Sequence, residues 1–443
     1  MWFIFFLLTF LAFPNYSFAH AFGRLYNLPV PFWLYLYGAA AAIIVSFLII
    51  GFFINQTKKD ASYTPQKLFK LSPIVTPWLK AGSIFFFLLT IIAGLVGIDN
   101  SSQNFNMTFF WVIFILGMTY FTAIFGDIYS VINPWKTLVE YFEKFRGKEF
   151  TGFIKYPEKL AYYPALNFYF LFILLELLGQ TTPFKLSLAI LVYSLITFTG
   201  VLMFGKKWLS FGEFFAVFFS LIARISPLGH KKGLLSGRAG DFSLLLFILF
   251  MLSSTSFDGF RETKLWIGFA KSFLESNSYQ ELQIVALFIS PFVFLFIYLF
   301  FLFLGKLAVK SSESLQSLSL YFAFTLIPIA FVYNLSHYYT LFLTQGQEII
   351  RLISDPFGFG WNLFGTYNFR SNLFLIDANV TWHLQVAFIL LGHIAAVYFA
   401  HLVSLRVFPS RRSALFSQFP VLILMITYTI IGLWILSQPI GSQ

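Results

Sequence analysis

Residues 281–305 read ELQIVALFISPFVFLFIYLFFLFLG, a run whose only charged residue, Glu281, stands at its start. A helix can cross the hydrocarbon core of a bilayer when about 20 consecutive residues are apolar. This stretch therefore predicts a membrane-spanning helix, and the same criterion predicts about ten spans in the whole chain. They cover residues 30–54, 78–98, 107–125, 161–179, 186–204, 241–257, 281–305, 316–343, 380–405 and 415–437. The expected fold class is all-α, a polytopic transmembrane helix bundle.

The composition excludes a soluble enzyme, a disordered protein and a nucleic-acid binder. The 443 residues are 58% hydrophobic and 11% charged, with a mean hydropathy of +0.79. A soluble domain is about 45–50% apolar and about 25% charged. The formal net charge of +11 is typical of a membrane protein with basic cytoplasmic loops. We therefore expect the lipid bilayer, and no nucleic acid, as the partner of this chain.

The N-terminal residues predict a signal peptide. An apolar run is followed by Ser17 and Ala19, small residues at the two positions that a signal peptidase reads. We expect cleavage to remove residues 1–19 and to leave 20–443 as a single integral membrane domain that begins with His20. The alternative is that the apolar run stays attached as an uncleaved first helix.

Lysine and arginine are unevenly distributed over the predicted loops. Roughly three-quarters of the 29 Lys and Arg residues lie in alternate loops, which the positive-inside rule assigns to the cytoplasm. With ten spans and a cleaved leader, we expect a multi-pass protein of the bacterial inner (cytoplasmic) membrane. Both mature termini would then be extracytoplasmic.

Residues 208–225 are also apolar, but they include Glu213 and Arg224. An additional span here would move the later basic loops to the opposite side of the membrane, against the positive-inside rule. We therefore expect a re-entrant or interfacial helix on the cytoplasmic face. The alternative, in which 208–225 spans and 241–257 does not, would place Lys231 outside.

Four ionisable residues interrupt the predicted spans: Glu176, His337, His383 and His393. Such groups are costly in a bilayer and mark functional sites by default. The expected orientation places Glu176, His337 and His383 in the outer half of the membrane. His383 and His393 lie about 15 Å apart along one helix at ~1.5 Å per residue, too far to share one ligand. His337 and His383 lie at similar depths.

These positions predict an extracytoplasmic metal site. His20, at the expected mature N-terminus, could fold onto His337 and His383, and a free amine beside an imidazole chelates copper(II). The chain has no cysteine, so thiolate ligands are excluded and copper or zinc would be held by these imidazoles. The alternative for His337 is an interhelical hydrogen-bond network with Tyr333 and Asn334, which lie one turn earlier on the same helix face.

Two long outer loops are expected to cover this site, and Pro328 should kink the eighth span. The loops are 256–280 and 344–379, and the second, with its Asp-Pro turn, is expected to fold as a lid. Asp258 opens the first loop and Asp355 lies in the second. Both are candidate catalytic residues, as bases beside a metal-bound water.

Several stretches together resemble bacterial multi-span membrane proteins that are labelled fenitrothion hydrolase. These stretches are AHAFGRLYNLPVP (19–31), NPW (133–135), FDG (257–259), IPIA (327–330) followed by His337 and Tyr338, SDPFGFGWNLFGT (354–366), GH (392–393) and AH (400–401). They are spread over most of the chain. The resemblance implies hydrolysis of organophosphate triesters.

Three functions remain open on the sequence. The first is a metal-dependent hydrolase of small apolar esters or phosphoesters, with a small-molecule substrate at an extracytoplasmic-facing site. The second is a copper- or haem-handling membrane protein, in which His337 and His383 would be ligands. The third is a small-solute transporter, although no single span carries charges through both halves of the membrane.

Overall fold

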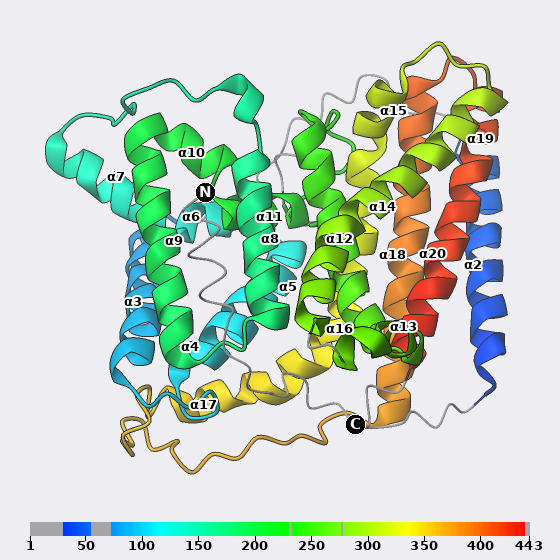
Figure 1. The fold of residues 1–443 in the computed structure, drawn as a ribbon. Helices are drawn as coiled ribbons and strands as arrows, with labels where there is room; N and C mark the ends of the chain where they lie inside the picture. The colour runs from blue at the N-terminus through cyan, green and yellow to red at the C-terminus, as the bar shows by residue number, and fades with distance from the viewer. Residues whose placement is uncertain (1–29, 55–71, 230–232, 276–277, 439–443) are drawn as a thin grey trace.

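The computed structural model describes residues 30–54, 72–229, 233–275 and 278–438. All regular elements in these ranges are helices, and ten helical segments are long and apolar enough to cross a membrane (Figure 1). The expected multi-span, all-α bundle is thereby confirmed. The ten segments are Phe32–Phe53, Val75–Val96, Phe105–Phe125, Glu158–Leu178, Pro183–Phe204, Phe242–Arg261, Tyr279–Ala308, Leu315–Leu352, Ala378–Val407 and Arg411–Ser437. The signal peptide predicted over 1–19 lies outside the described residues.

Several spans are built from more than one helical element. The α-helices are α2 (Phe32–Phe53), α3 (Val75–Val96), α4 (Phe105–Met107), α5 (Met118–Phe125), α6 (Tyr129–Ile132), α7 (Pro134–Arg146), α8 (Tyr163–Leu178), α9 (Pro183–Phe204), α10 (Lys206–Phe211), α11 (Phe214–Ile222), α12 (Phe242–Arg261), α13 (Lys264–Glu275), α14 (Tyr279–Ala308), α15 (Leu315–Phe322), α16 (Ile327–Gln345), α17 (Ile349–Leu352), α18 (Ala378–Val407), α19 (Arg411–Phe416) and α20 (Gln418–Ser437). A π-helical segment, η1 (Thr108–Gly117), joins α4 to α5, and short 3-10 turns form η2 (Glu158–Leu160), η3 (Ala323–Leu326) and η4 (Gly346–Glu348).

Helix α12 lies at the centre of the bundle. Its apolar window is 89% buried inside the protein, against 17% for α14, because α8, α14, α16 and α20 all pack against it. A helix surrounded by protein can carry polar side chains that a lipid-facing helix cannot. The last turn of α12 contains two such residues, Asp258 and Arg261, and both are buried.

The eighth span is interrupted, as the proline in it predicts. Helix α15 ends at Phe322, the 3-10 turn η3 follows, and α16 begins at Ile327 with Pro328 in its first turn. Proline has no amide hydrogen to donate to the preceding turn and its ring clashes with that turn. The break therefore separates α15 from α16, the helix that carries His337.

The segment predicted to be re-entrant or interfacial does not span. It consists of α10 and α11, which are too short to cross a bilayer, and most side chains of α11 are buried among other helices. The carboxylate of Glu213 explains the break between them, because it accepts hydrogen bonds from the amides of Phe215 and Ala216 and from the side chains of Tyr193 and Asn133. Glu213 is thus the N-cap of a buried helix.

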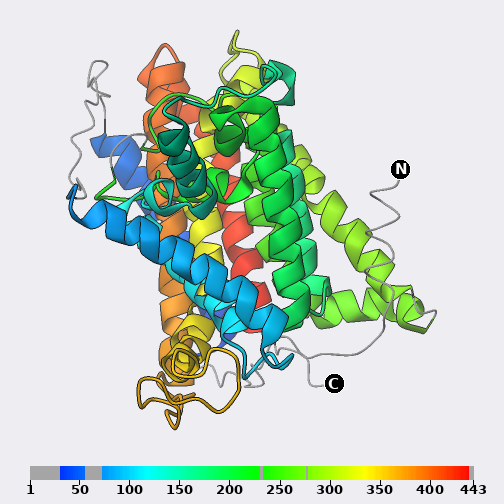
Figure 2. The same cartoon turned by 90° about the vertical axis from the view of Figure 1, so that its left-hand side faces the viewer.

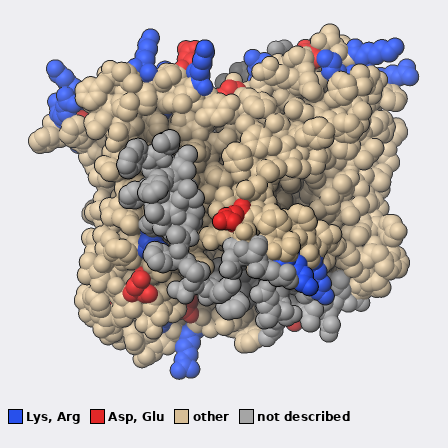
Figure 3. All heavy atoms as spheres, in the orientation of Figure 1, with Lys and Arg blue, Asp and Glu red and all other residues tan. Residues whose placement is uncertain are grey.

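The two ends of the bundle differ in charge. We call the end that carries Lys144, Lys206 and Arg411 the basic end, and the end that carries Arg261 and Gln345 the site end. On the face drawn in Figure 3, Lys and Arg side chains lie mostly along the edge that belongs to the basic end. At the site end, α13 runs across the direction of the long helices (Figure 2).

Candidate functional site

A buried carboxylate is the centre of the candidate site. Asp258 on α12 accepts hydrogen bonds from three side chains: Arg261 Nε at 3.2 Å, His337 Nε2 at 2.9 Å and the Tyr338 hydroxyl at 2.7 Å. The side chains of Asp258 and Arg261 are only 2% and 7% exposed. Arg261 also donates from Nη1 to the carbonyl oxygen of Leu177, the last residue but one of α8, at 3.0 Å. Three helices, α8, α12 and α16, therefore meet at one charged cluster.

The local sequence explains how α12 supplies two of these groups. Asp258 and Arg261 are three residues apart, so they lie on one helix face, and a cation in the last turn of a helix is favoured by the helix dipole. The prediction that α12 ends near residue 257 and that Asp258 opens a loop is wrong. The helix continues through Arg261 because the arginine side chain pairs with Asp258 and donates a hydrogen bond to a carbonyl oxygen at the end of α8.

The contact with Asp258 places one proton on the imidazole ring of His337. A carboxylate can only accept, so Nε2 carries the hydrogen that is donated to Asp258. In its neutral form the imidazole keeps a lone pair at Nδ1, for which the described part of the chain supplies no hydrogen bond. The side chain of His337 is 18% exposed. This arrangement is an oriented base, with one nitrogen fixed by a carboxylate and the other able to accept a proton.

A second unused polar group lies beside this base. Tyr333 precedes His337 by one helical turn, and its hydroxyl is buried without a hydrogen-bond partner among the described residues. A methyl group on Gly259 would lie 3.8 Å from Cε1 of His337 and 3.8 Å from the Tyr333 hydroxyl oxygen. The imidazole and the phenol therefore both lie beside Gly259 on α12, where Cγ2 of Ile435 also packs, 2.5 Å from the position of such a methyl group.

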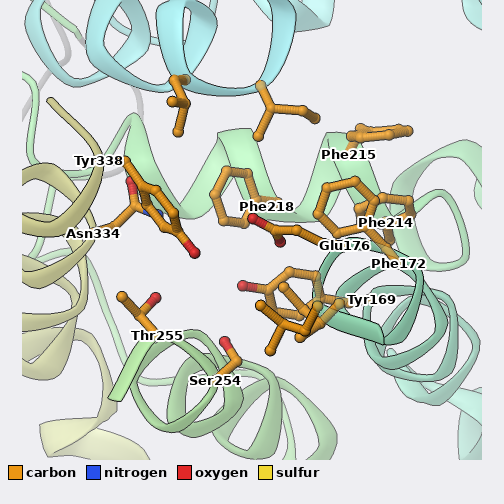
Figure 4. Close-up of a pocket in the computed structure, with 14 residues that line it drawn as sticks. Tyr169, Phe172, Glu176, Phe214, Phe215, Phe218, Ser254, Thr255, Asn334 and Tyr338 are labelled. Carbon is orange, nitrogen blue, oxygen red and sulfur yellow. The ribbon is translucent and has the colours of Figure 1, made fainter. Parts of the chain in front are cut away.

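Tyr338 also lines a cavity, so the cluster borders it (Figure 4). The cavity offers about 30 Å³ to the centres of water-sized molecules, and one water needs roughly 10–15 Å³ on this measure. Aromatic and aliphatic side chains form much of its wall. Its polar atoms come from Tyr169, Glu176, Ser254, Thr255, Asn334 and Tyr338. The π-helical segment η1 also contributes to the wall, through Ile115 and Leu116.

The structure brings together two of the predicted site residues, Asp258 and His337, but separates others. His383 binds the hydroxyl of Tyr35 on α2 at 3.2 Å through Nε2 and the carbonyl of Asn379 at 2.7 Å through Nδ1. No group of three or more His, Asp or Glu side chains that could hold a metal ion occurs among the described residues. The predicted third ligand, His20, lies outside those residues, so the complete ligand set remains a prediction.

Asp355, the other candidate base, lies within the folded loop, and its catalytic role stays a prediction. It is 3% exposed, and its carboxylate accepts hydrogen bonds from the amides of Phe359 and Gly360 at 2.9 and 2.7 Å. The loop that it organises is bound to the corner between α3 and α4, through backbone hydrogen bonds of Ile98 and Phe105. The expected lid is therefore a folded loop, and these contacts attach it to α3 and α4.

Sequence reasoning missed Arg261 and Tyr338 and did not select Glu176 for the site. Each had a visible signal: Arg261 follows Asp258 at helical spacing, Tyr338 adjoins His337, and Glu176 interrupts an apolar span.

No family model, curated protein or solved structure matches the chain. The function is therefore argued from the chemistry of the cluster.

Proposed function

We propose that this multi-span membrane protein is a hydrolase of small, neutral, apolar esters, organophosphate triesters among them, and that His337 and Asp258 activate the attacking water. One observation carries the proposal. The 2.9 Å hydrogen bond from Nε2 of His337 to the Asp258 carboxylate fixes the ring, while Nδ1 retains its lone pair. A histidine oriented by a buried aspartate is a recurrent general base in hydrolytic enzymes.

The chemistry proceeds in balanced steps. A water molecule transfers a proton to Nδ1 of His337 as its oxygen attacks the phosphorus or carbonyl carbon of the ester. Asp258 stabilises the imidazolium that forms, and Arg261 keeps the aspartate paired. The bond to the leaving alcohol breaks, and the proton on Nδ1 goes to that alcohol. The unpaired hydroxyl of Tyr333 is placed to donate to the oxygen or sulfur on which negative charge develops.

The surroundings of the base support the choice of substrate. The cluster lies among apolar spans, where a neutral ester partitions easily and a charged substrate would lose its hydration. Its position at the site end, opposite the basic end, agrees with an extracytoplasmic-facing site under the positive-inside rule. The resemblance to proteins labelled fenitrothion hydrolase points to the same class of compound.

The geometry favours this base over the metal-dependent and metal-handling alternatives. Copper, zinc or haem ligation was predicted to join His337 and His383. Both ring nitrogens of His383 are engaged by Tyr35 and Asn379, and His337 is held by Asp258. The proposal therefore assigns the activation of water to the dyad and gives His383 no part in it.

The test is hydrolysis of fenitrothion by the purified protein in lipid nanodiscs, followed by absorbance of the released nitrophenol. Removing a general base lowers kcat by about 10²–10⁴-fold, so we expect this loss for His337→Asn. Glu262→Gln is a matched control, because Glu262 is 39% exposed and lies 3.5 Å from the same arginine. It should leave the rate unchanged within about twofold of wild type.

His383→Asn separates the proposal from the predicted metal site. The dyad mechanism predicts a rate close to wild type, whereas a site built on His20, His337 and His383 predicts loss in both histidine variants. Full activity of His337→Asn would refute the proposed base.

A further inference from the structure

Helix α13 lies where two membrane spans reach the site end of the bundle. Span α12 ends at Arg261, α13 covers Lys264–Glu275, and α14 begins at Tyr279. The short links on both sides keep α13 close to the depth at which these two spans end. It also runs across the direction of the long helices (Figure 2). Its axis therefore lies along the surface of the membrane.

One face of α13 packs against the protein. Trp266 and Ala270, one helical turn apart, are both buried. The Trp266 ring meets the rings of Phe257 and Phe260 on α12 edge-on, at centroid distances of 5.5 and 5.8 Å. Its Nε1 donates a hydrogen bond to the hydroxyl of Tyr279 on α14 at 3.2 Å. These contacts fix which sides of α13 are turned away from the bundle.

A second face carries an exposed apolar stripe, which consists of Leu265, Phe269 and Phe273. These residues follow each other at intervals of four, so they lie on one side of the helix. They are 61%, 63% and 37% exposed. The adjoining span α14 exposes Val285 and Phe288 in its own first half, where a membrane span contacts lipid. The stripe therefore lies beside a surface that is already in contact with acyl chains.

A third face is basic and open. Lys264 and Lys271 are seven residues apart, which is two helical turns, and Gly268 lies between them on the same side. Neither lysine forms an ion pair with another residue whose side chain the structure describes. A methyl group on Gly268 would meet no atom within 4 Å. The space between the two ammonium groups is therefore free for an anionic group.

We propose that α13 is an interfacial helix that binds phospholipids of the leaflet at the site end. The apolar stripe contacts acyl chains, and Lys264 and Lys271 contact lipid phosphates. An amphipathic helix in the plane of the interface has this division between a charged face and an apolar face. Lysine side chains suit the boundary, because their aliphatic stems cover apolar surface while the ammonium groups reach the headgroups.

The depth of α13 favours lipid over a protein as the occupant of the stripe. A soluble partner or a second copy of the chain would also cover exposed phenylalanines. It would have to displace the lipid that surrounds α12 and α14 at the level where both spans end. Lipid needs no such displacement, and its phosphates supply the anionic groups that the two lysines lack. The bound leaflet would hold Trp266 against Phe257 and Phe260, which flank Asp258 in the sequence.

The test is the depth of nitroxide labels in lipid nanodiscs, measured by electron paramagnetic resonance from collisions with oxygen and with a water-soluble nickel complex. The chain has no cysteine, so a single introduced cysteine is labelled uniquely. We expect the label of Phe269→Cys to lie about 5–10 Å below the lipid phosphates. The label of Gly268→Cys should lie at the level of the phosphates. Leu265→Cys is a second position on the stripe and should match Phe269→Cys.

Two further positions calibrate the measurement within the same chain. Phe296→Cys reports the hydrocarbon core, because Phe296 is an exposed residue within the span α14. Glu149→Cys reports water, because Glu149 is exposed at the basic end. Labels at 265 and 269 that are as accessible to nickel as the label at 149 would overturn the proposal. So would labels that neither reagent reaches, which indicate a covering protein or a second copy, and a label at 268 as deep as the one at 296. The measurement uses no ester substrate, so its outcome is independent of the proposed hydrolysis.

Discussion

Replacing Asp258 by asparagine would remove the buried anion of Arg261 and leave only the more exposed carboxylate of Glu262, 3.5 Å away. The side chains of Asp258 and Arg261 are 2% and 7% exposed, so the cost is that of a buried ion pair, not of a solvent-screened surface pair. Breaking such a pair from one side destabilises by about 3–5 kcal/mol. The introduced amide would keep an acceptor for one donor but would lack the charge that faces Arg261 and His337. We expect a loss of free energy of unfolding within that range.

A double-mutant cycle separates the pair from the general effect of each substitution. The variants are Asp258→Asn, Arg261→Gln and the double variant. Each single substitution leaves one buried charge without its partner, whereas the double variant leaves none. We therefore expect a coupling energy of about 2–3 kcal/mol. The assay is reversible unfolding in mixed micelles, followed by tryptophan fluorescence. Glu149→Gln is the control, since Glu149 is 72% exposed in its ion pair with Lys206 and should change stability by less than about 1 kcal/mol. Equal effects of Asp258→Asn and Glu149→Gln would refute this reasoning.

Three further predictions concern other parts of the bundle. Glu213→Ala removes the acceptor at the start of α11 and should cost about 1–3 kcal/mol in free energy of unfolding, measured in the same micelles; no loss would contradict its role as N-cap. Gly94→Ala would make a methyl carbon overlap with Nδ2 of Asn106 and with the backbone of α9 at Pro183, so we expect a loss of about 1–3 kcal/mol and a lower Tm, and an unchanged Tm would mean that α3 and α9 are less closely packed. Asp355→Ala removes two backbone hydrogen bonds and should speed proteolytic cleavage within 353–377; cleavage at the wild-type rate would show that the carboxylate does not hold the loop.

The spans were predictable from the sequence because each is a local property. A run of apolar residues must be helical in a bilayer wherever its neighbours lie, so the run at 281–305 and the other nine could be located one at a time. Pro328 likewise acts on its own helix. The end of α12 was missed because its last turn is stabilised by a contact with α8, which lies far away in the sequence.

The site was only partly predictable for the same reason. Depth in the membrane could be estimated from the distance to a helix end, and the prediction placed Glu176, His337 and His383 in the same outer half. The direction in which a side chain points around its helix could not be predicted from the sequence, because it depends on which helices are neighbours. His337 faces α12 and meets Asp258, whereas His383, at a similar expected depth, faces α2 and meets Tyr35.

In the proposed mechanism, Asp258 holds His337 as a neutral base with its proton on Nε2. Nitrogen-15 NMR of histidine-labelled protein measures this directly, and with six histidines in the chain the His337 signals can be assigned by their loss in His337→Asn. We predict a protonated Nε2 and an unprotonated Nδ1 in wild type, with a shifted Nε2 resonance in Asp258→Asn. A proton on Nδ1, or a His337 spectrum that is unchanged by Asp258→Asn, would contradict the account.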